Sequence, residues 1–247
     1  MRIRILGVNI DAVTRKEARA AAAGFLAGAS GRLIVTPNPE MLVLARRDAE
    51  FKSVLNKADL AIPDGVGLLW AARRAGTPLP ERVTGTDLMQ DIVALAAASG
   101  KSVFLLGGQN GEEALAAAVL RERHPGLKIG SAPGGMVSRR PDGRWAADPV
   151  SVGRLRTFAP DILFAAFGHG KQEKWLADNL DGLPTVRLAM GVGGAFNFVA
   201  GRARRSPDWM RRLGLEWLWR LIREPRRWRR IFDAVVVFPF LLITEKN

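Results

Sequence analysis

Asp64 is the residue of this chain best suited to act as a general base. It lies in the segment Pro63-Asp64-Gly65, which follows the short apolar run Leu60–Ile62 and precedes a helical pattern. A carboxylate in such a turn can project into a cleft and accept a proton from a hydroxyl group. The same neighbours also suit an aspartate that only stabilises a turn or caps a helix. The turn alone leaves both interpretations open.

Other polar or glycine-rich segments also follow directly after apolar runs. They are Thr36-Pro37-Asn38-Pro39, Gly107-Gly108, Gly168-His169-Gly170 and Gly191–Gly194. Ligands of open α/β sheets bind outside the carboxyl ends of the strands, so these segments form one candidate site together with Asp64. Glycines such as Gly107, Gly108, Gly168 and Gly193 let the backbone approach a phosphate group.

The individual polar residues of these segments have alternative roles. Thr36 and Asn38 could orient a sugar hydroxyl or a phosphate, but taken alone they favour a helix cap. His169 could be a catalytic base or a solvated loop residue. Gln172 and Glu173 begin a helix after the same turn, so their side chains can point into the cleft.

Several classes of site are excluded by what the sequence lacks. It contains no cysteine and only two histidines, and it has no Asp-x-Asp pair. It also lacks the G-x-G-x-x-G and G-x-x-x-x-G-K-[ST] strings of common nucleotide sites. We therefore expect chemistry without a metal and without a cofactor. With no export signal and no cysteine, the cytoplasm is the expected compartment.

The elements that must position these residues alternate regularly up to about residue 200. The predicted strands are Ile3–Ile10, Leu33–Thr36, Leu60–Ile62, Ser102–Leu106, Leu127–Gly130, Asp161–Phe167 and Thr185–Met190. The predicted helices are Thr14 to about Gly28, Glu40–Asn56 with a break near Asp48, Val66–Arg74, Thr86 to about Ser99, Glu112–Arg123, Pro149–Phe158 and Gln172–Leu180. Residues 131–147 are expected to form a loop. This alternation predicts an α/β fold with a single open, mostly parallel, doubly wound (Rossmann-like) sheet.

The composition changes abruptly near residue 200. Residues 202–230 contain eleven arginines against three acidic residues, a local charge of +8 out of the chain's +13, and four tryptophans lie among them. We therefore predict an α/β catalytic domain over residues 1–200 and a basic, Trp-rich helical appendage over 201–247. Ser206, followed by Pro207, should cap a helix that runs to Pro225 and carries Trp209, Leu213 and Trp217 on one stripe.

The run from Ile231 to Ile243 is apolar but too short to span a bilayer. It predicts a purely interfacial helix that docks on an anionic membrane surface. Basic residues with aromatics also bind nucleic acid. An apolar tail would be a liability there, so we expect no nucleic-acid partner.

Seven segments in this order resemble the WecG/TagA/CpsF family of glycosyltransferases. They are TPNPEM (36–41), IPDGVG (62–67), RVTGTDL (82–88), FLLGG (104–108), AFGHGKQEKW (166–175), GVGGAFNFVAG (191–201) and RRSPDWMRRLGLEWLWRLIREPRRWRR (204–230). The resemblance runs from about residue 5 to 230, and the last block is the most specific. It implies a bacterial inverting hexosyltransferase, independent of metal, that is peripheral on the inner face of the cell membrane.

The resemblance also implies substrates and products. The donor would be a UDP-sugar, typically of N-acetylmannosamine, and the acceptor a polyprenyl-diphosphate-linked saccharide. The product would enter cell-surface polysaccharide or teichoic acid synthesis. We expect a monomer or a weak homo-oligomer. Two other classes are alternatives: a nucleotide-sugar-modifying or redox enzyme on a similar sheet, and a basic membrane- or nucleic-acid-binding protein without transferase activity.

The family pattern assigns roles to particular residues. Asp64 matches the proposed base, and Thr36 and Asn38 match residues that line the acceptor and donor pocket. Arg82 and Gln172 match further residues of the cleft. Arginines of the last block, placed at Arg220, Arg227 and Arg230, would close over the donor diphosphate. The chain departs from the pattern at Gly170, where the family usually has proline, and at Asn197, where it has aspartate.

Overall fold

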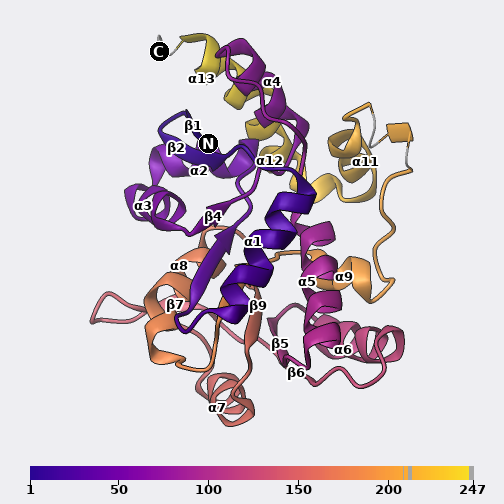
Figure 1. Ribbon diagram of the computed structural model, residues 1–247. Coiled ribbons are helices and arrows are strands. Elements are labelled where there is room, and N and C mark those ends of the chain that lie inside the picture. The colour runs from indigo at the N-terminus through magenta and orange to yellow at the C-terminus, as the bar shows by residue number, and fades with distance from the viewer. Residues whose placement is uncertain (208, 211–212, 245–247) are drawn as a thin grey trace.

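The computed structural model describes residues 1–207, 209–210 and 213–244, and its centre is a six-stranded parallel sheet (Figure 1). The strands are β3 (Arg32–Val35), β4 (Leu60–Ala61), β5 (Val103–Gly107), β6 (Ile129–Ala132), β9 (Ile162–Ala166) and β10 (Leu188–Gly191). Their order across the sheet is β4-β3-β10-β9-β5-β6, and all neighbours are parallel. The predicted α/β fold with an open parallel sheet is therefore confirmed.

Helices cover both faces of this sheet. One face carries α1 (Arg15–Ala27), α5 (Gly85–Ser99), α6 (Glu112–Arg123) and α9 (Ala195–Val199). The other carries α2 (Pro39–Arg47), α3 (Ala49–Lys57), α7 (Pro149–Phe158) and α8 (Lys171–Asn179), which continues into η1 (Leu180–Gly182). Successive residues of each strand point to opposite faces, so Leu105 packs in one layer and Leu106 in the other. Burial on both faces explains why these strands are continuous apolar runs.

Local signals located most helix ends correctly. Thr14 and Glu17 form the predicted capping box at the start of α1, and α2 and α3 are separated at Asp48, which caps α3. The helix α4 (Val66–Arg74) has the predicted bounds. The start of α5 was predicted at the wrong residue: Thr84, not Thr86, accepts the capping hydrogen bond from the Asp87 N–H group.

Two predictions of extended or irregular structure were wrong. The segment predicted as one strand, Ile3–Ile10, is an antiparallel hairpin of β1 (Arg2–Ile5) and β2 (Val8–Asp11) outside the main sheet. Leu6 and Gly7, both with positive φ, form its two-residue turn. Within the predicted loop 131–147, β7 (Ser138–Arg139) pairs with β8 (Trp145–Ala146).

The C-terminal segment is a series of short helices joined to α9 by an extended linker (Figure 1). These helices are α11 (Glu216–Arg223), η2 (Pro225–Arg227), α12 (Trp228–Phe232), the π-helical turn η3 (Asp233–Val237) and α13 (Phe238–Thr244). The single helix predicted from Ser206 to Pro225 is not formed. Gly214 has a φ of +74°, which is not a helical conformation, and it interrupts the helix before α11. Part of the predicted helix start, Asp208, lies outside the described residues.

The apolar run from Ile231 onward is only partly exposed. Phe238 is fully buried in the core beside α2, and Leu241 and Leu242 pack against the same cluster. Other members, such as Phe240, are exposed on the outer side. The prediction of a purely interfacial helix is therefore wrong, because one face of this run completes the core. No helix of the described residues has the length and apolar character needed to cross a membrane.

Candidate active site

The carboxyl ends of β3, β4, β5, β9 and β10 lie along one edge of the parallel sheet, and the chemistry-bearing segments lie there. Asp64 follows β4, and its backbone N–H group donates to the Pro37 carbonyl after the neighbouring strand β3. Its side-chain Oδ2 accepts a hydrogen bond of 3.1 Å from the N–H group of Gly85, at the start of α5. The turn thus holds the carboxylate between two strand ends and a helix N-terminus, where negative charge is stabilised.

Burial by the surrounding protein raises the pKa of Asp64 to about 6. The hydrogen bond from Gly85 and the positive charges of Arg220 and Arg82 act in the opposite direction, while the negative charge of Glu216 adds to the rise. The best pKa for a general base lies near the working pH. A carboxylate with a pKa of about 6 is ionised at neutral pH and is a better proton acceptor than an ordinary aspartate.

Two arginines share one glutamate beside Asp64. Arg82 Nη2 donates to Glu216 Oε2 at 3.3 Å, and Arg220 Nη2 donates to Glu216 Oε1 at 2.9 Å. Arg220 also lies over the ring of Phe198, 5.9 Å from its centroid. Through Arg82, Glu216 links α11 to the edge of the sheet that carries Asp64, and the two guanidinium groups leave one positive charge that Glu216 does not neutralise.

Thr36 and Asn38 follow β3 beside Asp64 but have different environments. Thr36 is buried, and its methyl side lies so close to Gly85 that a Cβ on that glycine would be 3.1 Å from Thr36 Cγ2. Asn38 Oδ1 accepts a hydrogen bond from the Met41 N–H group at 2.9 Å, so Asn38 caps α2. Asn38 therefore has the capping role that the sequence favoured. Any contact of its side chain with a substrate would be made by the amide nitrogen.

The buried pair Gln172 and Glu173 stabilises the glycine turns through hydrogen bonds. Gln172 Nε2 donates to Glu173 Oε1 at 2.8 Å, and Gln172 Oε1 accepts from the Gly193 N–H group at 3.2 Å. Glu173 Oε2 accepts from the Gly170 N–H group at 2.7 Å, and burial raises its pKa. These contacts tie the turn after β9 to the turn after β10.

The remaining glycines differ in how close other groups come to them. A Cβ on Gly107 would meet the Ala166 carbonyl oxygen at 2.6 Å, and the Gly108 N–H group donates to that same oxygen. By contrast, nothing lies within 4 Å of a Cβ at Gly168. Gly107 is therefore required for close strand packing, whereas the side of Gly168 is open.

His169, Glu40 and Arg230 form a second polar cluster at this edge. His169 Nε2 lies 2.9 Å from Glu40 Oε1, and Arg230 Nη2 lies 2.6 Å from His169 Nδ1. Because a guanidinium group only donates, Nδ1 is the accepting nitrogen and Nε2 carries the hydrogen towards Glu40. Arg230 also pairs with Glu40 directly, so α12 is fastened to the first turn of α2. His169 is held in this cluster and does not stand free in solvent.

Replacing Glu40 by glutamine is expected to destabilise the fold. Burial opposes the ionised form, but the hydrogen bonds from His169 and Arg230 and the positive charge of Arg230 outweigh it and lower the pKa of Glu40 to about 2. A depressed pKa contributes stability above the unfolded value of 4.5, and this stability is lost as the pH falls towards 2. We expect Glu40→Gln to lower the free energy of unfolding by up to about 3 kcal/mol at pH 7.

Urea unfolding at pH 7 and pH 3.5 measures this effect. The difference between Glu40→Gln and the unsubstituted protein should shrink at the lower pH, and Glu122→Gln on the exposed side of α6 serves as the control. An equal difference at both pH values would contradict the charge-based explanation.

Comparison with known proteins identifies the family. The family model described as "Glycosyl transferase WecG/TagA/CpsF family" matches residues 3–247. The chain belongs to the WecG/TagA/CpsF glycosyltransferase family. It is therefore a hexosyltransferase, as the sequence motifs implied.

Curated relatives cover nearly the same length. A protein of Bacillus subtilis (strain 168) is 30% identical over 217 residues, which are 88% of this chain and 81% of the relative. A protein of Staphylococcus aureus (strain MW2) is 30% identical over 250 residues, covering 100% of this chain and 94% of the relative. Both are named N-acetylglucosaminyldiphosphoundecaprenol N-acetyl-beta-D-mannosaminyltransferase.

The three arginines expected at the donor diphosphate occupy different positions in this glycosyltransferase. Arg220 lies with Arg82 and Glu216 near Asp64, and Arg230 lies in the His169 cluster. Arg227 pairs with Glu224, three residues earlier in its own segment. The structure thus places Arg220 near Asp64, while Arg227 and Arg230 are paired with other acids.

Sequence reasoning missed Glu216 and Glu40 as partners of the site arginines. Glu216 stands four residues before Arg220, a spacing that pairs side chains on a helix, so this partner could have been found. The Arg82 to Glu216 contact, across 134 positions, has no such signal. Glu113 was also missed: it is buried beneath the Gly108 turn, and its Oε2 has no hydrogen-bond partner among the described residues.

Proposed function

We propose that this glycosyltransferase transfers N-acetylmannosamine or a related hexose from a UDP-sugar to a polyprenyl-diphosphate-linked saccharide, with inversion at the sugar's C1. The names of the relatives support the sugar and the lipid-linked acceptor. The observation that carries the proposal is the position of Asp64, a carboxylate with a raised pKa beside two guanidinium groups.

The proposed reaction is a single displacement. The Asp64 carboxylate accepts the proton of the acceptor hydroxyl as the hydroxyl oxygen attacks C1 of the donor sugar. The bond between C1 and the β-phosphate oxygen breaks, and UDP leaves with the electron pair. Arg82 and Arg220 stabilise the negative charge that develops on the diphosphate, which a metal ion does in other transferases. The glycine turns, Thr36 and Asn38 form the remaining walls around the two substrates.

A donor screen tests this proposal. The purified protein is incubated with a panel of UDP-hexoses and a short-chain N-acetylglucosamine diphosphate lipid, with and without EDTA. Mass spectrometry should detect a disaccharide product with UDP-N-acetylmannosamine or a close relative, and NMR should show the inverted anomer. No product with any UDP-sugar, or activity abolished by EDTA, would overturn the corresponding part of the proposal.

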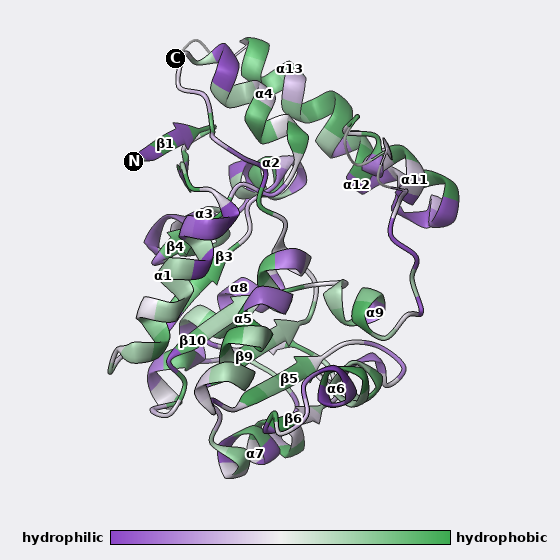
Figure 2. Cartoon of the chain, turned by 45° about the vertical axis from the view of Figure 1, so that its right-hand side comes forward, coloured by the Kyte–Doolittle hydropathy of each residue, from purple (hydrophilic) through white to green (hydrophobic). Residues whose placement is uncertain are grey.

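We further propose that residues 201–247 close over the active site and hold the protein on the inner face of the membrane. Large apolar side chains are exposed along this segment and on the neighbouring α4. They include Trp70, Trp209, Leu213, Ile222, Trp228, Phe232, Val236, Phe240 and Ile243. Figure 2 shows hydrophobic colouring on α4 and α13, which lie together at one end of the molecule. Apolar residues flanked by arginines suit the headgroup boundary of an anionic bilayer.

Replacing Phe240 by glutamate should weaken membrane binding. Phe240 is 62% exposed, so the change leaves the core intact while it removes an apolar anchor and adds a repelled charge. We expect at least a roughly tenfold lower affinity for vesicles with anionic lipid in a co-sedimentation assay. Met136→Glu, at an even more exposed site outside this segment, is the control. Equal binding of the two variants would contradict the assignment of this surface.

A further inference from the structure

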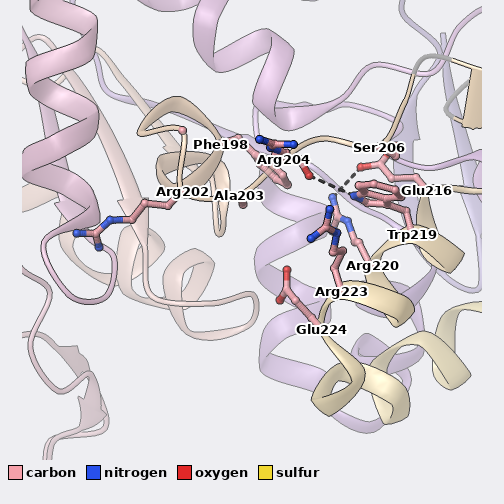
Figure 3. A pocket seen from close by; sticks show the side chains of 11 residues that line it. Phe198, Arg202, Ala203, Arg204, Ser206, Glu216, Trp219, Arg220, Arg223 and Glu224 are labelled. Carbon is pink, nitrogen blue, oxygen red and sulfur yellow. Dashed lines mark hydrogen bonds and ion pairs between the residues drawn. The ribbon is translucent and has the colours of Figure 1, made fainter.

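A charged cavity lies beside the catalytic edge, between α11 and the linker that follows α9 (Figure 3). Its volume is about 350 Å³, which is at the small end of ligand pockets. Phe198, Arg204, Ser206, Glu216, Trp219 and Arg223 are among the residues that line it. Arg202 also contributes to the wall, but its guanidinium points away and donates to the Asn110 carbonyl.

The cavity has an excess of positive charge. Glu216 is shared by Arg82 and Arg220, and Glu224 is paired with Arg227. The guanidinium groups of Arg204 and Arg223 form no ion pair with any described residue. Arg204 and Arg223 both line the cavity, so their two positive charges are not neutralised by a described acid, which suits a ligand with two negative charges.

Further groups of the wall are suited to an anionic ligand. Ser206 is 4% exposed, and its hydroxyl has no hydrogen-bond partner in the described part of the chain. Arg223 lies 5.0 Å above the ring of Trp219, whose Nε1 donates to the Arg204 carbonyl at 3.2 Å. Trp219 therefore fixes the linker to α11 and orients Arg223. A buried hydroxyl without a partner normally indicates a missing ligand or water.

The helix α11 divides this charged cavity from an apolar surface. Glu216, Trp219, Arg220 and Arg223 lie on the side that lines the cavity. The opposite side carries Trp217, Leu218, Leu221 and Ile222, and Ile222 is 67% exposed. An amphipathic helix of this kind can hold a charged headgroup on one side while the attached chain follows its apolar side.

We propose that this cavity binds the diphosphate of the lipid-linked acceptor, whose polyprenyl chain leaves along the apolar side of α11. The inference rests on the proposed function, because only that reaction supplies a diphosphate attached to a lipid. Donor and acceptor share the same diphosphate chemistry, so position decides between them. Asp64 does not line the cavity, but Glu216 and Arg220 both line it and act on the Asp64 charge. A diphosphate held here is separated from Asp64 by Glu216 and Arg220, as expected for an acceptor whose sugar lies between its diphosphate and the attacking hydroxyl.

The test compares binding of the two substrates to the full chain. Isothermal titration with a short-chain N-acetylglucosamine diphosphate lipid, and separately with UDP, is carried out on Arg204→Gln, Arg223→Gln and Arg226→Gln. Arg226 is an exposed arginine of the same segment outside the cavity and serves as the matched control. We expect each cavity variant to bind the acceptor analogue at least about tenfold more weakly, with UDP affinity within about twofold of the unsubstituted protein.

Two other outcomes would overturn the inference. Weaker UDP binding with unchanged acceptor binding would assign the cavity to the donor, and no change with either ligand would exclude it as a diphosphate site. Both results overturn the inference while sugar transfer by the unsubstituted protein persists, so the proposed function would survive them. If the unsubstituted protein binds neither ligand, the proposed function itself fails. Arg223→Lys, which keeps the charge, should recover part of the acceptor affinity if its loss reflects charge and not misfolding.

Discussion

Replacing Asp64 by asparagine is expected to reduce the rate of sugar transfer by roughly 10²- to 10⁴-fold, the range of a lost general base. The asparagine oxygen can still accept the hydrogen bond from the Gly85 N–H group, so the turn should keep its geometry. Initial rates at saturating donor and acceptor measure the loss. UDP affinity should be unchanged, because the variant removes a proton acceptor and leaves Arg82 and Arg220 in place.

The pH dependence gives an independent check of the same residue. Because the base must be ionised, kcat/KM should fall about tenfold per pH unit below the Asp64 pKa of about 6. Asp64→Asn should lack this acidic limb. Asp181→Asn, the same change at an exposed position, should keep both the rate and the limb. Substantial turnover by Asp64→Asn with an unchanged acidic limb would refute the assignment of the base.

The raised pKa also makes Asp64 a source of instability. The folded protein holds the Asp64 proton more tightly than the unfolded chain, whose value is 3.8. Stability is therefore lost as the pH rises from about 3.8 through 6. Asp64→Asn removes this penalty, so at pH 7.5 it should be more stable than the unsubstituted protein by up to about 3 kcal/mol. An inactive but more stable variant is the pattern expected of a functional carboxylate.

The extent to which the sequence predicts this fold depends on how local the signals are. Helices such as α4, α6 and α7 have their predicted bounds because caps, prolines and glycines act within a few residues. The sequence predicts one strand where β1 and β2 form a hairpin. The turn Leu6-Gly7 does not interrupt the apolar pattern, and the whole run is no longer than an ordinary strand. Phe238 shows a different limit. An apolar run has the same composition whether it packs on a core or on a bilayer.

The candidate site could also be predicted only where the signals are local. The sheet rule places Asp64, Thr36 and the glycine turns at one edge, since each follows a strand. It cannot place α11, because the linker after α9 determines where that helix lies. That linker is tied to α5 by the pair Arg205 and Asp87. The contacts of Arg82 and Arg230 with Glu216, Glu40 and His169 depend on this path and have no counterpart in sequence spacing.

The second large effect is expected at Arg220. Arg220→Ala removes a guanidinium group that can stabilise the leaving diphosphate, and loss of one such donor costs roughly 10²- to 10³-fold in rate. The variant has a second consequence, since the positive charge of Arg220 lowers the pKa of Asp64. Without it, the acidic limb of the pH profile should move to a higher pH. Rates between pH 5 and 8 measure both effects in one experiment.

Glu216 provides the matched test, because its charge acts on Asp64 in the opposite direction. Its negative charge raises the Asp64 pKa, so Glu216→Gln should move the acidic limb to a lower pH. Arg229→Ala, an exposed arginine that lies over Trp228, should leave the limb where it is. Shifts of opposite sign for the two variants would require that α11 lies against Asp64 during catalysis. Shifts of the same sign, or none, would mean that α11 leaves the base before sugar transfer, and the closing role of residues 201–247 would then be wrong.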